Sequence, residues 1–69
     1  MLAFDLDKMK ELRQRKHLTL MDMSEALGYE SPNGYFYLEQ GRIQIKANQL
    51  ATIARVLEVD IQDLYSQAA

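Results

Sequence analysis

The segment from Leu18 to Arg42 constrains the fold more than any other part of the chain. Its sequence is LTLMDMSEALGYESPNGYFYLEQGR, in which an apolar stripe at helical spacing ends at Gly28, a residue type that readily takes the positive φ found just after a helix. A second helical pattern begins at Ser31-Pro32, since serine is a common N-cap and proline suits the first helical position. The segment therefore predicts two short helices, about 20–27 and 32–40, joined by a tight turn.

The same segment is acidic. Between Leu18 and Gly41 it contains no Lys or Arg and four acids, Asp22, Glu25, Glu30 and Glu39. Residues 1–17 contain five Lys or Arg against three acids, whereas residues 42–69 contain three of each, so the whole chain has a net charge of -2. A surface that binds a polyanion must therefore take its cations from the two flanks of the segment.

Apolar residues at helical spacing predict three further helices, about 5–16, 47–57 and 61–65. Asp5 can cap the first of them. No segment alternates polar and apolar residues over the length of a strand, so no strand is expected. The expected fold is all-α, a compact five-helix domain that covers the whole chain apart from a frayed tail at 66–69.

Length and composition agree with one small domain. The chain has 69 residues, of which 48% are hydrophobic and none is cysteine. A small chain without disulfides suits a reducing compartment, so we expect a cytoplasmic location. The N-terminal residues do not resemble a signal peptide, because Asp5 and Asp7 follow Phe4 directly, and no apolar run approaches the roughly 18 residues of a membrane span. No membrane association is expected.

Landmarks in five places carry a resemblance to a known family. They are Leu12-Arg13, Met23-Ser24 with Leu27-Gly28, Ser31-Pro32 with Tyr35, Leu38-Glu39-Gln40-Gly41, and the run from Ile53 to Asp60 with Leu64. In these landmarks the chain resembles the Cro/lambda-repressor-like, or xenobiotic-response-element (XRE), helix-turn-helix family over about residues 4–65. The resemblance implies a helix-turn-helix motif at about 19–41 whose second helix enters the DNA major groove. It also implies that Arg13 pairs with Glu39; the alternative is a solvated surface pair worth about 0–1 kcal/mol.

The second helix of the motif is expected to have one face toward the core and one toward DNA. A helical wheel that points Tyr35 and Leu38 inward turns four side chains outward. Amide side chains can pair with adenine, and an aromatic ring can contact a thymine methyl group. The resemblance adds the first turn of the helix, where we expect Gly34 to allow a close approach to the groove. The candidate base-reading residues are Ser31, Asn33, Gly34, Phe36, Tyr37 and Gln40.

Phosphate contacts are expected mainly from the flanks of the motif. The candidates are Arg15, Lys16, Thr19, Arg42 and Lys46. For each cation the alternative is an ordinary solvated surface charge. Two departures from the family pattern lower the expected affinity: Leu20 stands where many members have glutamine, and Tyr37 stands where many have Arg or Lys.

A weakly binding monomer gains affinity by dimerising, because two recognition helices about 34 Å apart meet both half-sites of a palindrome. We therefore expect a homodimer. Its candidate interface residues are Val59, Ile61, Leu64 and Tyr65, beside Leu57. For Leu57 and Leu64 the alternative is burial in the core of the single chain.

The sequence favours DNA binding over catalysis. His17 is the one histidine, glycine-rich phosphate loops are absent, and no His, Asp or Glu set has metal-binding spacing, so no enzyme activity, metal, cofactor or small-molecule ligand is expected. The preferred function is a sequence-specific DNA-binding transcriptional regulator of the bacterial or phage repressor type, which reads a palindromic operator in the major groove as a homodimer. The alternative is a protein-interaction module on the same fold, such as an antitoxin or the anchoring domain of a longer regulator, whose aromatic face contacts protein.

Overall fold

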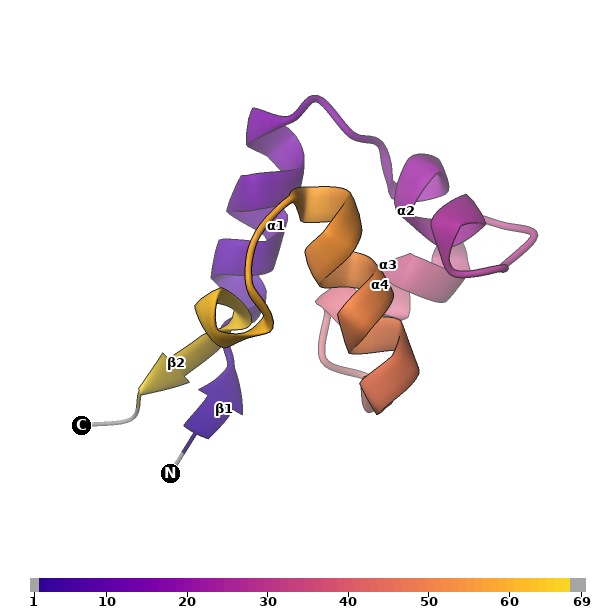
Figure 1. Cartoon of the computed structure of the whole chain (residues 1–69). Coiled ribbons are helices and arrows are strands. Elements are labelled where there is room, and N and C mark those ends of the chain that lie inside the picture. Colours follow the sequence, from indigo (N-terminus) through magenta and orange to yellow (C-terminus); the bar gives the residue numbers. More distant parts are fainter. Residues whose placement is uncertain (1, 68–69) are drawn as a thin grey trace.

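Four α-helices and one 3-10 helix lie between two short strands in the computed structural model, which describes residues 2–67 (Figure 1). The order along the chain is β1 (Leu2–Phe4), α1 (Leu6–Arg15), α2 (Leu20–Ala26), α3 (Asn33–Glu39), α4 (Ala47–Leu57), the 3-10 helix η1 (Ile61–Leu64) and β2 (Tyr65–Gln67). Helix α2 packs against α3 and α4, while α1 packs against α3 and η1. The two helices of the predicted motif are therefore neighbours in space as well as in sequence.

Local sequence signals explain where α1, α2 and α4 begin and end. The Asp5 carboxylate accepts a hydrogen bond from the Lys8 N–H at 3.0 Å and caps α1. Thr19 and Asp22 form a reciprocal capping box at the start of α2, with N–H to side-chain oxygen distances of 2.8 and 3.0 Å. Gly28 follows α2 with a φ of 86°. The helices predicted at 5–16, 20–27 and 47–57 are confirmed to within a residue or two at each end.

Helix α3 begins differently from the prediction. The sequence predicts a helix over 32–40 capped by Ser31, but α3 begins at Asn33, and Pro32 in the N-cap position makes no side-chain cap. The cap comes instead from Ser24 of α2, whose hydroxyl accepts a hydrogen bond from the Tyr35 N–H at 3.0 Å and donates one to the Pro32 carbonyl at 3.1 Å. The local signal fails because the buried Ser24 hydroxyl already satisfies the first turn of α3 from another helix.

Three further expectations about the fold are wrong. The fifth helix, predicted at 61–65, is a single 3-10 segment, so the described residues contain four α-helices and not five. Strands β1 and β2 pair antiparallel in the register Leu2↔Gln67, Ala3↔Ser66 and Phe4↔Tyr65, although no strand is expected from the sequence. Residues 66 and 67 therefore belong to a strand and not to a frayed tail, while 68 and 69 lie outside the described residues.

The two strands form because residues 2–4 and 65–67 lie side by side in the fold. The rings of Phe4 and Tyr65 stack with their centroids 4.9 Å apart and their planes 26° from parallel. The Asp5 N–H also donates to the Leu64 carbonyl at 2.9 Å, next to the paired strands. Strands of three residues are too short to leave an alternating pattern, so their pairing is not visible in the sequence.

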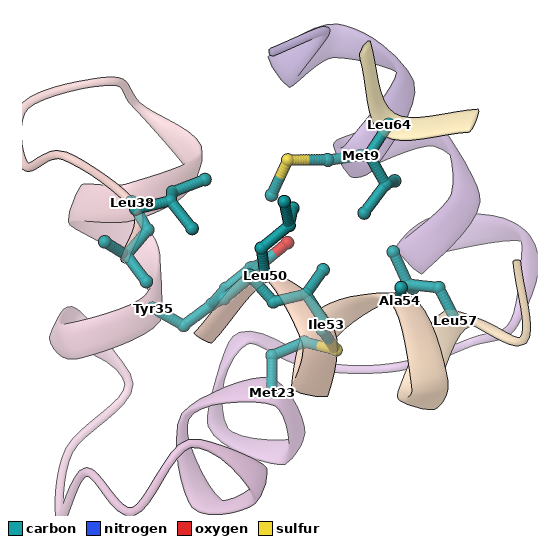
Figure 2. Packing of buried hydrophobic residues seen from close by; sticks show 10 residues of the cluster. Met9, Met23, Tyr35, Leu38, Leu50, Ile53, Ala54, Leu57 and Leu64 are labelled. Carbon is teal, nitrogen blue, oxygen red and sulfur yellow. The ribbon is translucent and has the colours of Figure 1, made fainter. Parts of the chain in front are cut away.

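The core lies where all four helices and η1 meet (Figure 2). Its buried hydrophobic residues are Met9, Met23, Tyr35, Leu38, Ile45, Leu50, Ile53, Ala54, Leu57 and Leu64. Leu57 and Leu64 are fully buried within the single chain, so the expectation that Leu64 lies at a dimer interface is wrong. Both leucines belong to the core cluster, in which η1 packs against α1 and α4.

Candidate nucleic-acid interface

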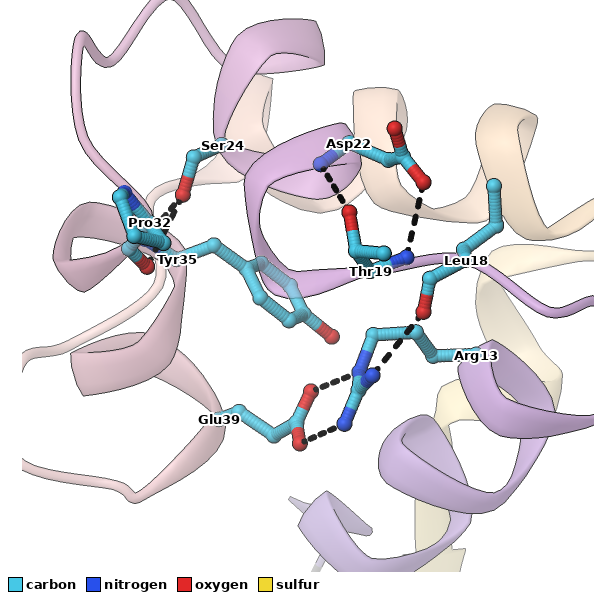
Figure 3. Close-up of polar contacts among 8 residues, drawn as sticks. All are labelled: Arg13, Leu18, Thr19, Asp22, Ser24, Pro32, Tyr35 and Glu39. Carbon is cyan, nitrogen blue, oxygen red and sulfur yellow. Dashed lines mark hydrogen bonds and ion pairs between the residues drawn. The ribbon is translucent and has the colours of Figure 1, made fainter.

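A buried ion pair fixes the position of α3 relative to α1 (Figure 3). Arg13, in the last turn of α1, donates from Nε to Oε2 of Glu39 at 2.9 Å and from Nη2 to Oε1 at 3.0 Å. Its third donor, Nη1, reaches the Leu18 carbonyl at 3.0 Å, in the loop before α2. The Arg13 and Glu39 side chains are only 11% and 3% exposed, so the pair expected from the resemblance is present and is not a solvated surface pair. Hydrogen bonding to Glu39 raises the pKa of Arg13 above its ordinary value.

Tyr35 lies beside this pair. Its side chain is fully buried, and its hydroxyl points toward Arg13 and Glu39 without a hydrogen-bond partner within the described part of the chain (Figure 3). Burial, together with the negative charge of Glu39, raises the pKa of Tyr35 well above its ordinary value. Tyr35 therefore stays neutral and fills the space between α3 and the ion pair.

The orientation of α3 agrees with the helical wheel. Tyr35, Leu38 and Glu39 are buried, and the opposite side of the helix faces solvent. Ser31, Asn33 and Gln40 are exposed, whereas Phe36 and Tyr37 are half-buried, with ring centroids 5.9 Å apart. Asn33, Phe36, Tyr37 and Gln40 follow the outward side of α3 to its C-cap, and Ser31 lies just before the helix; we call these five side chains the α3 face.

Gly34 does not leave an open space on this face. A Cβ atom added to Gly34 would lie 2.3 Å from Cγ of Tyr29 and 2.6 Å from both ring δ carbons. The aromatic ring therefore occupies the place that the sequence assigns to close contact with the groove, and that expectation for Gly34 is wrong. Glycine is required here because the Tyr29 side chain packs over the first turn of α3. Tyr29 is a residue that the sequence analysis missed.

Arg42 lies at the end of α3, next to Tyr37. The guanidinium carbon of Arg42 is 6.0 Å from the centroid of the Tyr37 ring, and the backbone N–H of Arg42 donates to the Tyr37 carbonyl at 3.0 Å. Neither Arg42 nor Lys46, which is the N-cap residue of α4, forms an ion pair with another described residue. A cation held over an aromatic ring gains about 0.5–1 kcal/mol at an exposed site. The Tyr37 ring thus lies beside a neighbouring arginine at the end of α3.

The other three candidates for phosphate contact are engaged elsewhere. Arg15 pairs with Glu11 on α1, and Lys16 pairs with Glu58 at 3.0 Å. Glu58 is the C-cap residue of α4, whereas Lys46 is its N-cap residue, so the partner of Lys16 lies about 18 Å along the helix axis from Lys46. Thr19 uses both its N–H and its hydroxyl oxygen in the capping box, and the hydrogen bonds from Thr19 lower the pKa of Asp22, which keeps a negative charge there. The structure does not bring these three residues together with Arg42 and Lys46.

The remaining candidate interface residues differ in exposure. Ile61 is 42% exposed, and it borders an open groove lined also by Ala51, Ala54, Arg55 and Val59. Val59 is half-buried, and Tyr65 stacks on Phe4. Ile61 is therefore the candidate that remains most available to a second chain.

No group of three or more His, Cys, Asp or Glu side chains is arranged to hold a metal ion in residues 2–67. Within the same range, no helix combines the length and apolar character that crossing a membrane requires.

Comparison with known proteins identifies the family of the chain. No curated protein and no solved structure matches it significantly. A family model described as a helix-turn-helix domain matches residues 7–65, nearly the whole chain, and confirms the resemblance expected over about 4–65. The matched range contains the capped α2, the turn at Gly28 and α3, with its solvent face free and its inner face joined to α1 through Arg13 and Glu39. The chain therefore belongs to the helix-turn-helix domain family.

Proposed function

We propose that this domain is a transcriptional regulator of the bacterial or phage repressor type that reads a palindromic operator in the major groove as a homodimer. The observation that carries the proposal is the α3 face. It presents Asn33, Gln40 and two aromatic rings to solvent from a helix that a buried ion pair and the Ser24 cap fix in position. A rigid helix with exposed amides is what direct readout of base edges requires.

Different residues of the α3 face take different roles in this proposal. Asn33 lies in the first turn, where a bidentate amide can pair with adenine, and Gln40 at the other end pairs likewise or holds a phosphate. Ser31 donates to a base or phosphate, and Phe36 contacts a thymine methyl group. Tyr37 contributes its hydroxyl and orients Arg42.

Electrostatic affinity comes first from Arg42 and Lys46, because both cations are exposed and unpaired among residues 2–67. Arg15 and Lys16 add to it only if DNA phosphates replace Glu11 and Glu58 as their partners. These exposed ion pairs are worth about 0–1 kcal/mol each, so their exchange is inexpensive. The proposed surface has few free cations, and this supports a second subunit on the same DNA.

The homodimer is proposed on the groove beside Ile61. Ala51 and Ala54 allow a close approach of a second helix there, and Arg55 and Asp60, both exposed, offer opposite charges to a second copy. Val59 also lines this groove, whereas Tyr65 stacks on Phe4, so the proposed surface keeps Val59 and Ile61 of the expected interface residues.

The alternative function is a protein-interaction module, favoured by one observation. The motif presents three exposed acids on α2 and in the turn, Asp22, Glu25 and Glu30, and its second helix carries the half-buried rings of Phe36 and Tyr37. Acids repel phosphate, whereas a motif that offers both acids and aromatic rings fits a basic protein partner.

A selection from random DNA duplexes separates the two functions. The purified protein is incubated with a pool of random-sequence duplexes, and the bound fraction is amplified and sequenced. We expect a palindromic sequence to be enriched by the wild type and by Gln14→Ala, a matched amide change on the exposed surface of α1, but not by Asn33→Ala. Absence of any enriched sequence with the folded wild type at low salt would contradict DNA reading and favour the protein-interaction module.

A further inference from the structure

Tyr29 connects the start of α3 to the start of α4. It follows Gly28 in the turn of the motif, and its ring packs over Gly34 in the first turn of α3. Its hydroxyl oxygen accepts a hydrogen bond from Nε2 of Gln49 at 2.8 Å, in the first turn of α4. One half-buried side chain therefore contacts both helix starts at once.

The Gln49 side chain also binds the backbone of Lys46. Its Oε1 accepts a hydrogen bond from the Lys46 N–H at 3.0 Å, which satisfies one of the N–H groups that a helix start leaves free. The carboxamide is thus bound at both ends, by the phenol and by the backbone. These two partners also determine which end of the Gln49 carboxamide is the oxygen, because the Lys46 N–H needs an acceptor.

We infer that Tyr29 is a positioning residue that sets the distance between the base-reading start of α3 and the phosphate-binding start of α4. The inference rests on the proposed DNA binding. Asn33 is the residue before Gly34, and Lys46 is the residue whose N–H the Gln49 side chain binds. Tyr29 therefore acts on the two contacts through Gly34 and Gln49 without touching DNA itself.

The physical reason is preorganisation. Lys46 is exposed at the end of the loop that follows Gly41, and its carbonyl accepts the helical bond from the Leu50 N–H at 2.9 Å, while its N–H is bound by the Gln49 side chain. Without the Tyr29 hydroxyl group, the Gln49 side chain loses one of its two hydrogen-bond partners and regains rotamer freedom. DNA binding would then have to order this turn, and affinity falls by that cost.

The test uses Tyr29→Phe, which keeps the ring over Gly34 and removes only the hydroxyl group. Affinities are measured by fluorescence anisotropy with the duplex most enriched in the selection above. Loss of one hydrogen bond corresponds to about a fivefold weaker affinity. If the loss acts through Lys46, the slope of log affinity against log salt falls by up to about 0.9 for each lysine, and Tyr29→Phe has no further effect in a Lys46→Gln background.

Thr52→Val is the matched control, because it also removes one hydroxyl group. This hydroxyl lies on α4, the helix of Gln49, and it donates to the Asn48 carbonyl of that helix. We expect it to bind as the wild type does. A wild-type affinity and salt slope for Tyr29→Phe would overturn the inference and leave the proposed function intact. An equal loss in the wild-type and Lys46→Gln backgrounds would also overturn it.

A measurement without DNA tests the coupling itself. Amide hydrogen exchange at Lys46 should be several-fold faster in Tyr29→Phe than in the wild type, because its acceptor Gln49 is less well ordered. Unchanged exchange at Lys46 would overturn the inference. Failure of the wild type to bind any duplex would instead overturn the proposed function, and with it the role of Tyr29 in DNA binding.

Discussion

At the scale of single residues, the Arg13–Glu39 pair is a buried contact between two helices. It joins α1 to α3 with two hydrogen bonds between its charged groups, and the third donor of Arg13 is used by Leu18. A buried ion pair adds little over an apolar pair of the same shape, but removing one partner leaves the other charge buried and unpaired. Its main effect is therefore to specify how α3 is placed.

We expect Arg13→Ala and Glu39→Ala each to lower the free energy of unfolding by about 3–5 kcal/mol, because each leaves an unpaired charge in a nearly closed site. Urea denaturation monitored by circular dichroism measures the change. Glu11→Ala is the control, since it breaks the exposed pair with Arg15 and should cost less than about 1 kcal/mol. Unchanged stability in both buried-site variants would show that the pair does not fix α3.

At the scale of elements, Ser24 shows how one helix starts the next. Its hydroxyl is the cap of α3, and it is supplied from the middle of α2. The turn of the motif is therefore held by a buried side chain as well as by Gly28.

The variant Ser24→Ala leaves the Tyr35 N–H buried without its acceptor, at a cost of about 1–3 kcal/mol in the free energy of unfolding. Ser31→Ala, at the serine that local rules choose as the cap, should leave stability unchanged, because Ser31 is exposed and makes no capping bond. Thermal denaturation of the two variants compares them directly. The reverse order of stabilities would show that Ser31 is the effective cap.

Three of the four α-helices of the described residues could be predicted from local sequence signals. Helices α1, α2 and α4 follow from caps and apolar stripes within a few residues of each boundary, as with Asp5, Thr19 and Gly28. The cap of α3 and the pairing of β1 with β2 depend on residues that are distant in the sequence, so local rules cannot find them.

Some features of the candidate site could likewise be predicted from the sequence, and others could not. The outward side of α3 follows from helical spacing, and the Arg13–Glu39 pair follows from a family resemblance. Tyr29 could not be found, because its role depends on Gln49 twenty residues later and on the space over Gly34. The pairing of Lys16 with Glu58 is hidden for the same reason.

At the scale of the whole molecule, two large hydrophobic side chains are exposed among the described residues, Ile43 and Ile61. They lie in different places, Ile43 beside Phe4 and Leu6, and Ile61 at the groove of α4 and η1. Only the second is part of the proposed dimer surface, so the two isoleucines form a matched pair for a test.

We expect light scattering at micromolar concentration to give twice the chain mass for the wild type and for Ile43→Lys, but a single chain mass for Ile61→Lys. A lysine at 61 places a buried, unpaired charge in the proposed interface, whereas one at 43 remains solvated. A wild type that is monomeric at every concentration would contradict the homodimer. A monomer produced by Ile43→Lys alone would place the interface at the other isoleucine.

The central claim is that α3 reads bases while Arg42 and Lys46 supply electrostatic affinity, and the salt dependence of binding tests it most directly. The affinity for the enriched duplex is measured over a range of salt concentrations for the wild type, Arg42→Gln, Lys46→Gln and Asn33→Ala. We expect each lost cation to lower the slope by about 0.9 per phosphate contact, and Asn33→Ala to keep the slope while losing preference for the enriched sequence over a scrambled duplex. Wild-type slopes in both cation variants, or full sequence preference in Asn33→Ala, would contradict this division of roles.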